Sequence, residues 1–156
     1  MRVLFVCAGN ICRSAMAEAI LRHLALTRPG LYHVEVGSAG TIALDGNRPL
    51  SACVAVMRDR FGLDLSGHRA RQVRPDLEAE LVLGMDLDVL REVRTSGVRG
   101  VVQLLGDAAG SPGEVVDDPY GGSEEDYRRC AEQIGRLVTA LADRLEGTAS
   151  ESRTSP

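Results

Sequence analysis

A cysteine and an arginine lie at the two ends of a short segment near the N-terminus. Cys7 and Arg13 are separated by five residues, which include Gly9 and Asn10. An apolar run precedes this segment, and the spacing typical of an amphipathic helix follows it. Glycine and asparagine tolerate left-handed backbone dihedrals, so the segment can form a tight loop whose N–H groups converge. Such a loop before a helix is suited to binding a phosphoryl group.

The side chains of this loop suggest how the phosphoryl group would react. The guanidinium of Arg13 can bind two phosphate oxygens, and the converging N–H groups favour the thiolate form of Cys7. Attack of that thiolate on phosphorus would form a thiophosphate intermediate. Alone, Cys7 would be interpreted as a buried apolar residue, but its neighbours favour a nucleophile. The predicted phosphate-binding residues are Ala8, Gly9, Asn10, Ile11, Cys12, Arg13 and Ser14.

A general acid is also needed, because the leaving oxygen takes up a proton and a water must later be activated. Asp118 is the candidate, since the following Pro119 stiffens its loop. Asp117 is the alternative by adjacency. Turn formation is a simpler interpretation of the same Asp-Asp-Pro-Tyr stretch.

The elements that must position these groups alternate along the chain. Apolar strands are predicted near residues 2–6, 32–36, 80–85 and 101–105. Helices are predicted between them, beginning near Ser14, Pro49, Pro75, Asp86 and Ser123, the last as a capping box with Asp126. This order predicts a single α/β domain, with a parallel sheet and helices on both faces. Ligands then bind beyond the carboxyl ends of the strands, where the loops carrying Cys7, Ser38, Asp86 and Asp118 should meet.

The composition narrows the class of protein. A chain of 156 residues suits one domain, predicted here as residues 1–146, with residues 147–156 as a disordered tail. No apolar stretch is long enough for a membrane span, and the N-terminal run is too short for a signal peptide, so we expect a cytoplasmic protein. A net charge of −4 argues against nucleic-acid binding. The four cysteines lack zinc-site spacing, so no metal is expected.

Together these residues resemble the low-molecular-weight protein tyrosine phosphatase family over about residues 2–146. The resemblance is carried by the loop at 7–14, Ser38-Ala39-Gly40-Thr41, His68-Arg69-Ala70-Arg71-Gln72, Met85-Asp86 and Asp118-Pro119-Tyr120. It implies a four-stranded parallel sheet and hydrolysis of phosphomonoesters, above all protein phosphotyrosine, without a cofactor. It assigns Cys7 as nucleophile, Arg13 to phosphate and transition-state binding, and Asp118 as general acid. It gives loop support to Asn10, Ser14, Ser38 and His68, and a substrate crevice to Ile11, Leu44 and Tyr120.

Three departures from the family pattern stand out. Ala15 replaces the usual proline, which makes the helix start less rigid, and Leu44 replaces an aromatic residue of many members, so that one wall of the crevice is less suited to stacking a phenyl ring. The acid loop has a single tyrosine before Gly121-Gly122, a form similar to that of the protein arginine phosphatases, which typically have threonine where this chain has Ile11. Ile11 therefore favours an aryl phosphate. Arsenate reductases of this fold need a cysteine pair near residues 80–90, which this chain lacks.

Three interpretations therefore stay open beside the leading one, which is hydrolysis of phosphotyrosine in a phosphorylated protein. Two of them concern the substrate, which can instead be a phosphoarginine protein or a small phosphomonoester. From another class, the chain can be a phospho-ligand-binding module or a redox sensor without turnover. In many relatives the residue matching Cys12 forms a reversible disulfide with the oxidised nucleophile; a buried filler is the simpler alternative. Cys53 and Cys130 are expected in the core. The sequence predicts no oligomeric state.

Overall fold

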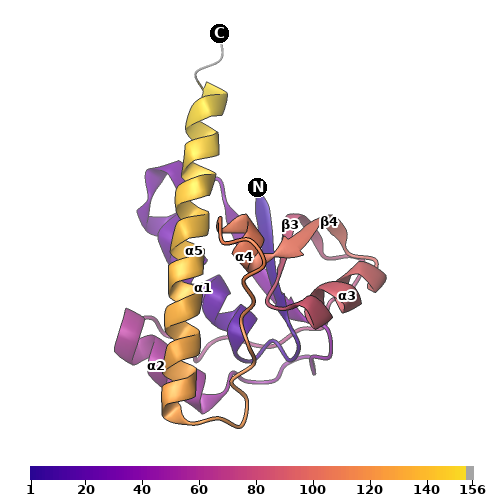
Figure 1. Cartoon of the computed structure of the whole chain (residues 1–156), viewed down its shortest axis with the longest axis vertical. Coiled ribbons are helices and arrows are strands. Elements are labelled where there is room, and N and C mark those ends of the chain that lie inside the picture. Colours follow the sequence, from indigo (N-terminus) through magenta and orange to yellow (C-terminus); the bar gives the residue numbers. More distant parts are fainter. Residues whose placement is uncertain (154–156) are drawn as a thin grey trace.

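The alternating order of strands and helices is confirmed by a computed structural model, which describes residues 1–153 (Figure 1). The elements follow in the order β1 (Arg2–Cys7), α1 (Arg13–Thr27), the 3₁₀ turn η1 (Pro29–Leu31), β2 (Glu35–Gly40), α2 (Ser51–Phe61), β3 (Glu78–Gly84), α3 (Leu87–Thr95), β4 (Arg99–Leu104), α4 (Leu105–Ala108) and α5 (Glu124–Arg153).

The four strands form one parallel sheet with the order β2-β1-β3-β4. At the carboxyl end of β1, Cys7 pairs with Gly40 of β2, and Val6 pairs with Gly84 of β3. All three strands therefore end at the same edge. This register brings the loops after β1, β2 and β3 together, as the fold class predicts.

Helices cover both faces of the sheet. On one face α1 lies between the sheet and the long helix α5, while α3 covers the other face near β3 and β4 (Figure 1). Alternate residues of β1 serve the two sides: Val3 and Phe5 belong to the larger core, and Leu4 and Val6 to the smaller one. Both cores are therefore anchored on the strand that ends at Cys7.

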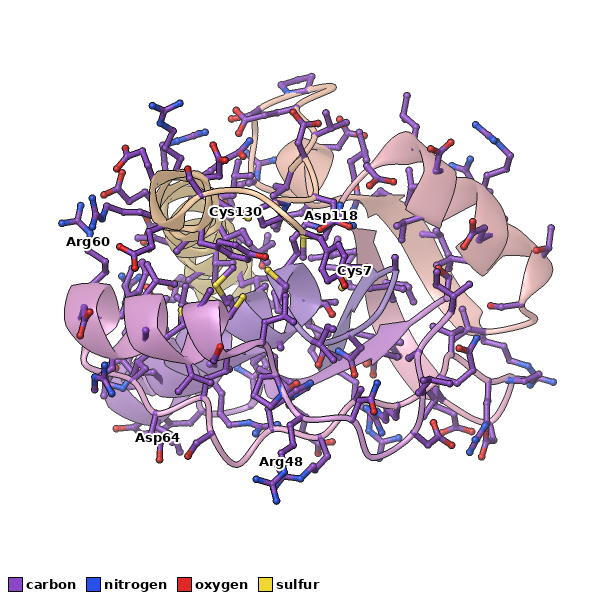
Figure 2. The ribbon with its side chains drawn as sticks, turned by 90° about the horizontal axis from the view of Figure 1, so that it is seen from below. Cys7, Arg48, Arg60, Asp64, Asp118 and Cys130 are labelled. Carbon is purple, nitrogen blue, oxygen red and sulfur yellow. The ribbon has the colours of Figure 1, made fainter. Side chains whose placement is uncertain are left out.

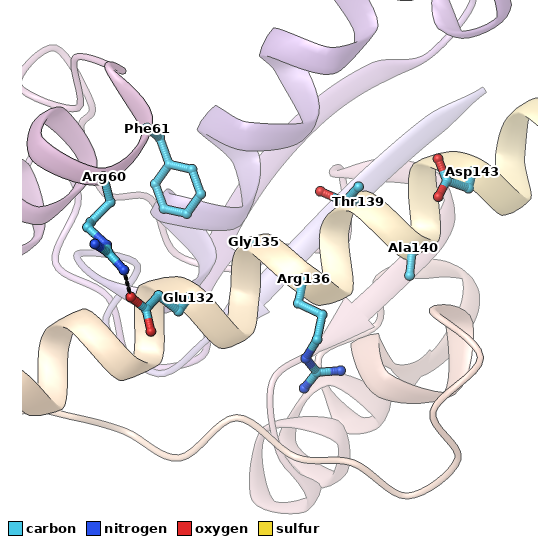
Figure 3. Close-up of a pocket in the computed structure, with 8 residues that line it drawn as sticks. All are labelled: Arg60, Phe61, Glu132, Gly135, Arg136, Thr139, Ala140 and Asp143. Carbon is cyan, nitrogen blue, oxygen red and sulfur yellow. Dashed lines mark hydrogen bonds and ion pairs between the residues drawn. The ribbon is translucent and has the colours of Figure 1, made fainter.

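Helix α2 is held against α5 at a glycine. A Cβ atom on Gly135 would lie 2.7 Å from Cζ of Phe61, so the ring occupies the space that any other residue would fill. Arg60 forms an ion pair with Glu132 beside this contact (Figure 3). A glycine inside a helix costs roughly 0.5–1 kcal/mol relative to alanine, and here it permits the close approach of the two helices.

Several of the predicted helix boundaries are confirmed. The side chain of Asp86 caps α3 by accepting a hydrogen bond of 2.9 Å from Val89 N. Ser123 N donates to Asp126 Oδ2 at 2.8 Å, and Asp126 N donates to Ser123 Oγ at 3.2 Å, which is the predicted capping box. Gly62 ends α2 in a left-handed conformation.

Other boundaries were wrong for identifiable reasons. Ser14 is not an N-cap: α1 begins at Arg13, and the Ser14 hydroxyl contacts the site instead. Helix α2 begins at Ser51 rather than at Pro49. Residues 75–77 form only a turn, because β3 begins at Glu78 and leaves no room for a helix.

The extent of β2 also differs from the prediction. The strand spans Glu35–Gly40, whereas the sequence pattern placed it at residues 32–36 and interpreted the Gly-Ser-Ala-Gly stretch as its end. Small residues occupy the strand because neighbours approach its backbone closely. A Cβ on Gly37 would lie 2.7 Å from Arg71 Nη2. The turn-like composition therefore reflects packing rather than a turn.

The C-terminal boundary lies beyond the predicted one. Helix α5 continues to Arg153, so the disorder expected from residue 147 onward is wrong for residues 147–153. Hydroxyl groups bond to the carbonyls of the preceding turn here, as Thr148 Oγ1 does to Leu145 O at 3.0 Å. Residues 154–156 lie outside the described part of the chain.

Candidate active site

The segment between β1 and α1 forms the predicted tight loop. Asn10 has a φ of 55°, and no other non-glycine residue of residues 1–153 has a positive φ. The loop rests on the chain that follows β2, because Thr41 N donates to Cys7 O and Ile42 N to Ala8 O, each at 3.0 Å. The left-handed asparagine turns the backbone as the sequence predicts.

The thiol of Cys7 lies under this loop at the N-terminus of α1. Its Sγ is 2.9 Å from Ser14 Oγ, and Ser14 N donates to the same sulfur at 3.4 Å. The Ser14 oxygen accepts a hydrogen bond of 2.8 Å from Asn10 Nδ2, and the acceptors near its own proton are Cys7 Sγ at 2.9 Å and Ala39 O at 3.4 Å. Two groups of Ser14 and the N-terminus of α1 thus face the Cys7 sulfur.

A buried network fixes the conformation of the loop. Asn10 Nδ2 also donates to Ser38 Oγ at 2.9 Å, and His68 Nε2 lies 2.6 Å from Asn10 O. Asn10 Oδ1 accepts from Arg71 N at 2.9 Å. The structure thus brings Asn10, Ser14, Ser38 and His68 together, as the resemblance implied. It adds Glu18, whose carboxylate accepts from Ser38 Oγ and lies 3.7 Å from His68 Nδ1.

The guanidinium of Arg13 is held in place by an acid and a carbonyl. Its Nη1 donates to Asp86 Oδ2 at 2.7 Å and to Val116 O at 2.9 Å. Burial opposes the charge of Arg13, but the hydrogen bond to Asp86 and the negative groups nearby outweigh it and raise the pKa of Arg13. Arg13 is therefore a permanent, oriented cation beneath the loop. Sequence reasoning recognised Asp86 as a helix cap and missed this second contact.

Asp118, the residue predicted to be the general acid, lies beside this cation. Its Oδ2 is 3.6 Å from Arg13 Nη2, although its side chain is 49% exposed. Its Oδ1 accepts from Tyr120 N at 3.1 Å, a turn that orients the carboxylate. Cys7 and Asp118 lie close together in the view of Figure 2. The carboxylate is thus both held in place and open to solvent.

The predicted crevice residues lie on separate segments. Ile11 is partly buried in the loop, whereas Leu44 and Tyr120 are 69% and 72% exposed. Ile42, which was not among the predicted crevice residues, is 72% exposed, and its backbone N–H donates to Ala8 O in the loop. The apolar side chains near the loop are thus available to a ligand.

Cys12 is buried on the inner side of the loop, in a cluster of three thiols. Cys53 Sγ donates to Cys12 Sγ at 2.9 Å, and Cys130 forms a further hydrogen bond with Cys12. The bond with Cys130 favours the Cys12 thiolate, but the bond from Cys53 and burial outweigh it, so the pKa of Cys12 is raised. The prediction that Cys53 and Cys130 are buried is confirmed; that they meet Cys12 was not predicted.

Within residues 1–153, no group of three or more histidine, cysteine or acidic residues is arranged to hold a metal ion. No helix of the described chain is long and apolar enough to cross a membrane.

The backbone of Gly40 packs closely against the backbone of the loop at Ala8 and Asn10. Gly40 was not among the predicted site residues. A Cβ at this position would overlap the carbonyl oxygen of Ala8 and lie 3.0 Å from Asn10 N. Because both neighbours are backbone atoms, no rotamer change relieves the overlap. We expect Gly40→Ala to lower kcat/KM at least about tenfold and to lower the free energy of unfolding by about 1–3 kcal/mol.

The measurements are steady-state kinetics on an aryl phosphate and urea unfolding. Gly67→Ala is the matched control, because a Cβ there meets no atom within 4 Å and the backbone is not left-handed. Equal kinetics for the two variants would contradict the role assigned to Gly40.

The contact between Asp86 and Arg13 gives a second prediction. Asp86→Ala removes an anchor of the guanidinium and should lower kcat/KM by about 10–100-fold. Asp86→Asn keeps both a hydrogen-bond acceptor and a good helix cap, so it should retain most of the activity. Thermal unfolding measures the loss of the cap separately, at about 1 kcal/mol for alanine. A variant Asp86→Ala that loses stability but keeps full kcat/KM would show that Asp86 is only a cap.

Known proteins match the chain over nearly its whole length. The family model described as low molecular weight phosphotyrosine protein phosphatase matches residues 2–151. The low molecular weight protein-tyrosine-phosphatase of Streptomyces coelicolor is 37% identical, over 96% of this chain and 98% of its own. The protein-arginine-phosphatase of Geobacillus stearothermophilus is 33% identical, over 93% of this chain and 96% of its own.

Solved structures agree with these matches. The low molecular weight protein tyrosine phosphatase from T. tengcongensis superposes with a TM-score of 0.82 at 35% identity, covering 92% of this chain and 99% of that one. A variant of the arginine phosphatase YwlE with a phosphorylated active-site serine gives a TM-score of 0.86 at 30% identity, covering 93% and 95%. Both the tyrosine-specific and the arginine-specific names therefore occur among similar chains.

Proposed function

Because the chain belongs to the low-molecular-weight phosphotyrosine protein phosphatase family, we propose that it hydrolyses phosphotyrosine in proteins, with Cys7 as the nucleophile. The chemistry of the family is hydrolysis of phosphoric monoesters. In this proposal Arg13 binds the phosphate, Asp118 is the general acid and base, and no metal takes part.

The reaction has two steps on the residues of the loop. The phosphate binds to the N–H groups of residues 8–14 and to Arg13, and the Cys7 thiolate attacks phosphorus. The bond from phosphorus to the phenolic oxygen breaks while Asp118 gives that oxygen its proton. Asp118, now a carboxylate, takes a proton from water, which attacks the phosphocysteine and releases phosphate and the Cys7 thiolate.

One observation carries the proposal: the contacts of Arg13 link the phosphate loop to the acid loop. The same guanidinium lies 3.6 Å from Asp118 and is fixed by Asp86, while Cys7 is stabilised at the start of its helix by Ser14. A phosphate bound at Arg13 would therefore lie between a thiolate and a carboxylate. That is the arrangement required for a displacement at phosphorus with protonation of the leaving group.

A second candidate function, arginine phosphatase, rests on the acid loop and on the matched proteins of that name. Gly121 has a φ of 79° in the acid loop, and the stretch Gly121-Gly122 is similar to the acid loop of the arginine phosphatases.

The deciding experiment compares kcat/KM on a phosphotyrosine peptide, a phosphoarginine peptide and a sugar phosphate, each with and without a chelator. We expect phosphotyrosine to be preferred, with no effect of the chelator; a preference for either other substrate would overturn this assignment.

Ile11 provides a direct test of the substrate class. Its apolar side chain suits a phenyl ring, whereas a threonine hydroxyl there could accept a hydrogen bond from a phosphoarginine nitrogen. We expect Ile11→Thr to shift the ratio of kcat/KM toward phosphoarginine by about tenfold or more. Ile11→Val, of similar shape but without a hydroxyl, is the control and should leave the ratio within a few-fold. A ratio that is unchanged in Ile11→Thr would remove Ile11 from the specificity determinants.

The non-catalytic alternative fails if phosphate is released, since a binding module would bind the phosphopeptide without turnover. The proposed chemistry also needs Cys7 as a free thiol, and all four cysteines are free in this structure. We therefore propose a reducing compartment such as the cytoplasm as its location, and phosphorylated proteins rather than nucleic acid as its partners.

A further inference from the structure

Three thiols that the proposed reaction does not use as nucleophiles meet directly beneath the phosphate loop. Cys12 comes from the loop, Cys53 from α2 and Cys130 from α5, and none is more than 6% exposed. The three are far apart in the sequence and are joined only by the packing of α2 and α5 around the loop. Figure 2 labels Cys130 of this cluster together with Cys7.

Cys12 is the member of the cluster that connects the nucleophile Cys7 with Cys53. It belongs to the same short loop as Cys7 and to the same buried cluster, and its sulfur lies 2.9 Å from that of Cys53. A disulfide has an S–S length of about 2.05 Å, so less than about 1 Å of approach separates Cys12 and Cys53 from bonding. Cys130 is a less direct candidate, because its thiol is also directed toward the carbonyl oxygen of Asp117 at 4.0 Å.

We propose that Cys53 takes over oxidation from the nucleophile through Cys12, so that the oxidised protein rests as a Cys12–Cys53 disulfide with Cys7 free. The proposal rests on the proposed function in one respect, since it needs Cys7 to be the reactive thiolate. It assigns a role to Cys53 that the hydrolysis reaction does not require.

The steps balance with a hydroperoxide as the oxidant. The Cys7 thiolate attacks one oxygen of hydrogen peroxide, the O–O bond breaks and hydroxide leaves, which gives a Cys7 sulfenic acid. The Cys12 thiol attacks the Cys7 sulfur, and water leaves. The Cys53 thiol then attacks the Cys12 sulfur and gives up its proton, while Cys7 leaves as the thiolate. Peroxide is reduced by two electrons, and Cys12 and Cys53 are oxidised by the same two.

The direction of the last step follows from the surroundings of Cys7. In thiol–disulfide exchange the thiolate that is better stabilised is the better leaving group. Ser14 Oγ and Ser14 N lie within hydrogen-bond distance of the Cys7 sulfur, whereas Cys12 and Cys53 lie in the apolar core with other thiols as their partners. Exchange therefore expels Cys7 and moves the disulfide into the core. Because Cys7 returns to the thiolate, it does not persist as a sulfenic acid that further peroxide would oxidise irreversibly.

Disulfide mapping distinguishes the two pairings in the full chain without any variant. Trypsin releases Cys7 and Cys12 together in residues 3–13, Cys53 in residues 23–58, since prolines follow Arg28 and Arg48, and Cys130 in residues 130–136. After equimolar peroxide, catalase and alkylation of free thiols, we expect peptide 3–13 cross-linked to peptide 23–58, with Cys7 alkylated. A disulfide that stays within peptide 3–13, or a cross-link to peptide 130–136, would overturn the proposal.

Recovery of activity provides a readout that does not depend on peptides. Wild type should regain most of its phosphatase activity after the peroxide is removed, without added reductant, whereas Cys53→Ala should stay inactive until dithiothreitol is added. Cys130→Ala is the matched control and should recover as wild type does. Equal unaided recovery in Cys53→Ala would contradict the transfer. Failure of the reduced wild type to release phosphate at all would instead contradict the proposed function, and the disulfide map would remain readable.

Discussion

Replacing Cys7 with serine should reduce phosphate release by about 10⁴-fold or more. A serine hydroxyl is uncharged at neutral pH and is a far weaker nucleophile than a thiolate. The two side chains are similar in size, so Ser14 and the loop keep their positions and the phosphate site remains formed. Binding of inorganic phosphate, measured by calorimetry, should therefore change by less than about tenfold while kcat collapses.

The control for this prediction is the same substitution at a thiol outside the reaction. Cys53→Ser should keep the activity of the reduced wild-type enzyme, since Cys53 lies on α2, outside the loop of residues 7–14, and its sulfur contacts Cys12. Full turnover by Cys7→Ser would show that the nucleophile lies elsewhere. Loss of both turnover and phosphate binding would show that the thiol serves mainly to shape the loop.

Replacing Asp118 with asparagine should lower kcat/KM by about 10²–10³-fold for phosphotyrosine, and clearly less for p-nitrophenyl phosphate. Tyrosine is a poor leaving group and needs a proton in the transition state, whereas p-nitrophenolate leaves readily without one. The asparagine keeps the size and polarity of the side chain but has no proton to give as an acid. A plot of log kcat/KM against leaving-group acidity should therefore become steeper in the variant.

Asp117→Asn is the matched control for the acid, because it makes the same change at the adjacent residue. Asp117 contributes its carbonyl to the Cys130 contact, whereas the carboxylate of Asp118 lies 3.6 Å from Arg13. We expect the control to keep the leaving-group dependence of the wild type. A steeper plot for Asp117→Asn, with Asp118→Asn unaffected, would reverse the assignment.

The sequence predicted the fold because β1 and β3 are clearly apolar and because strands alternate with helices along the chain. The parallel order follows from strands and helices that alternate. The errors occur where tertiary packing overrides local signals. β2 contains glycines because Arg71 and the phosphate loop approach its backbone, and the chain past residue 146 continues a helix whose preceding turns, up to Leu145, pack in the core.

The site was predictable where its residues are neighbours in the sequence and less so where they are not. The spacing of Cys7, Asn10 and Arg13 within one loop indicates a phosphate cradle by itself. Nothing local shows that Asp86, besides capping α3, holds Arg13 in position. The same holds for the thiol cluster, since Cys53 lies on an apolar helix face and its partner is determined by how α2 packs against the loop.

The most direct test of the proposed two-step reaction is detection of its phosphocysteine intermediate. The variant Asp118→Asn, which should slow hydrolysis of the intermediate, is mixed rapidly with p-nitrophenyl phosphate, quenched in acid and examined by mass spectrometry. We expect the peptide of residues 3–13 to gain the mass of one phosphoryl group, located on Cys7, and Cys7→Ser to show no gain on a cysteine. Steady release of p-nitrophenol with no phosphoryl group on that peptide at any time would contradict the two-step reaction.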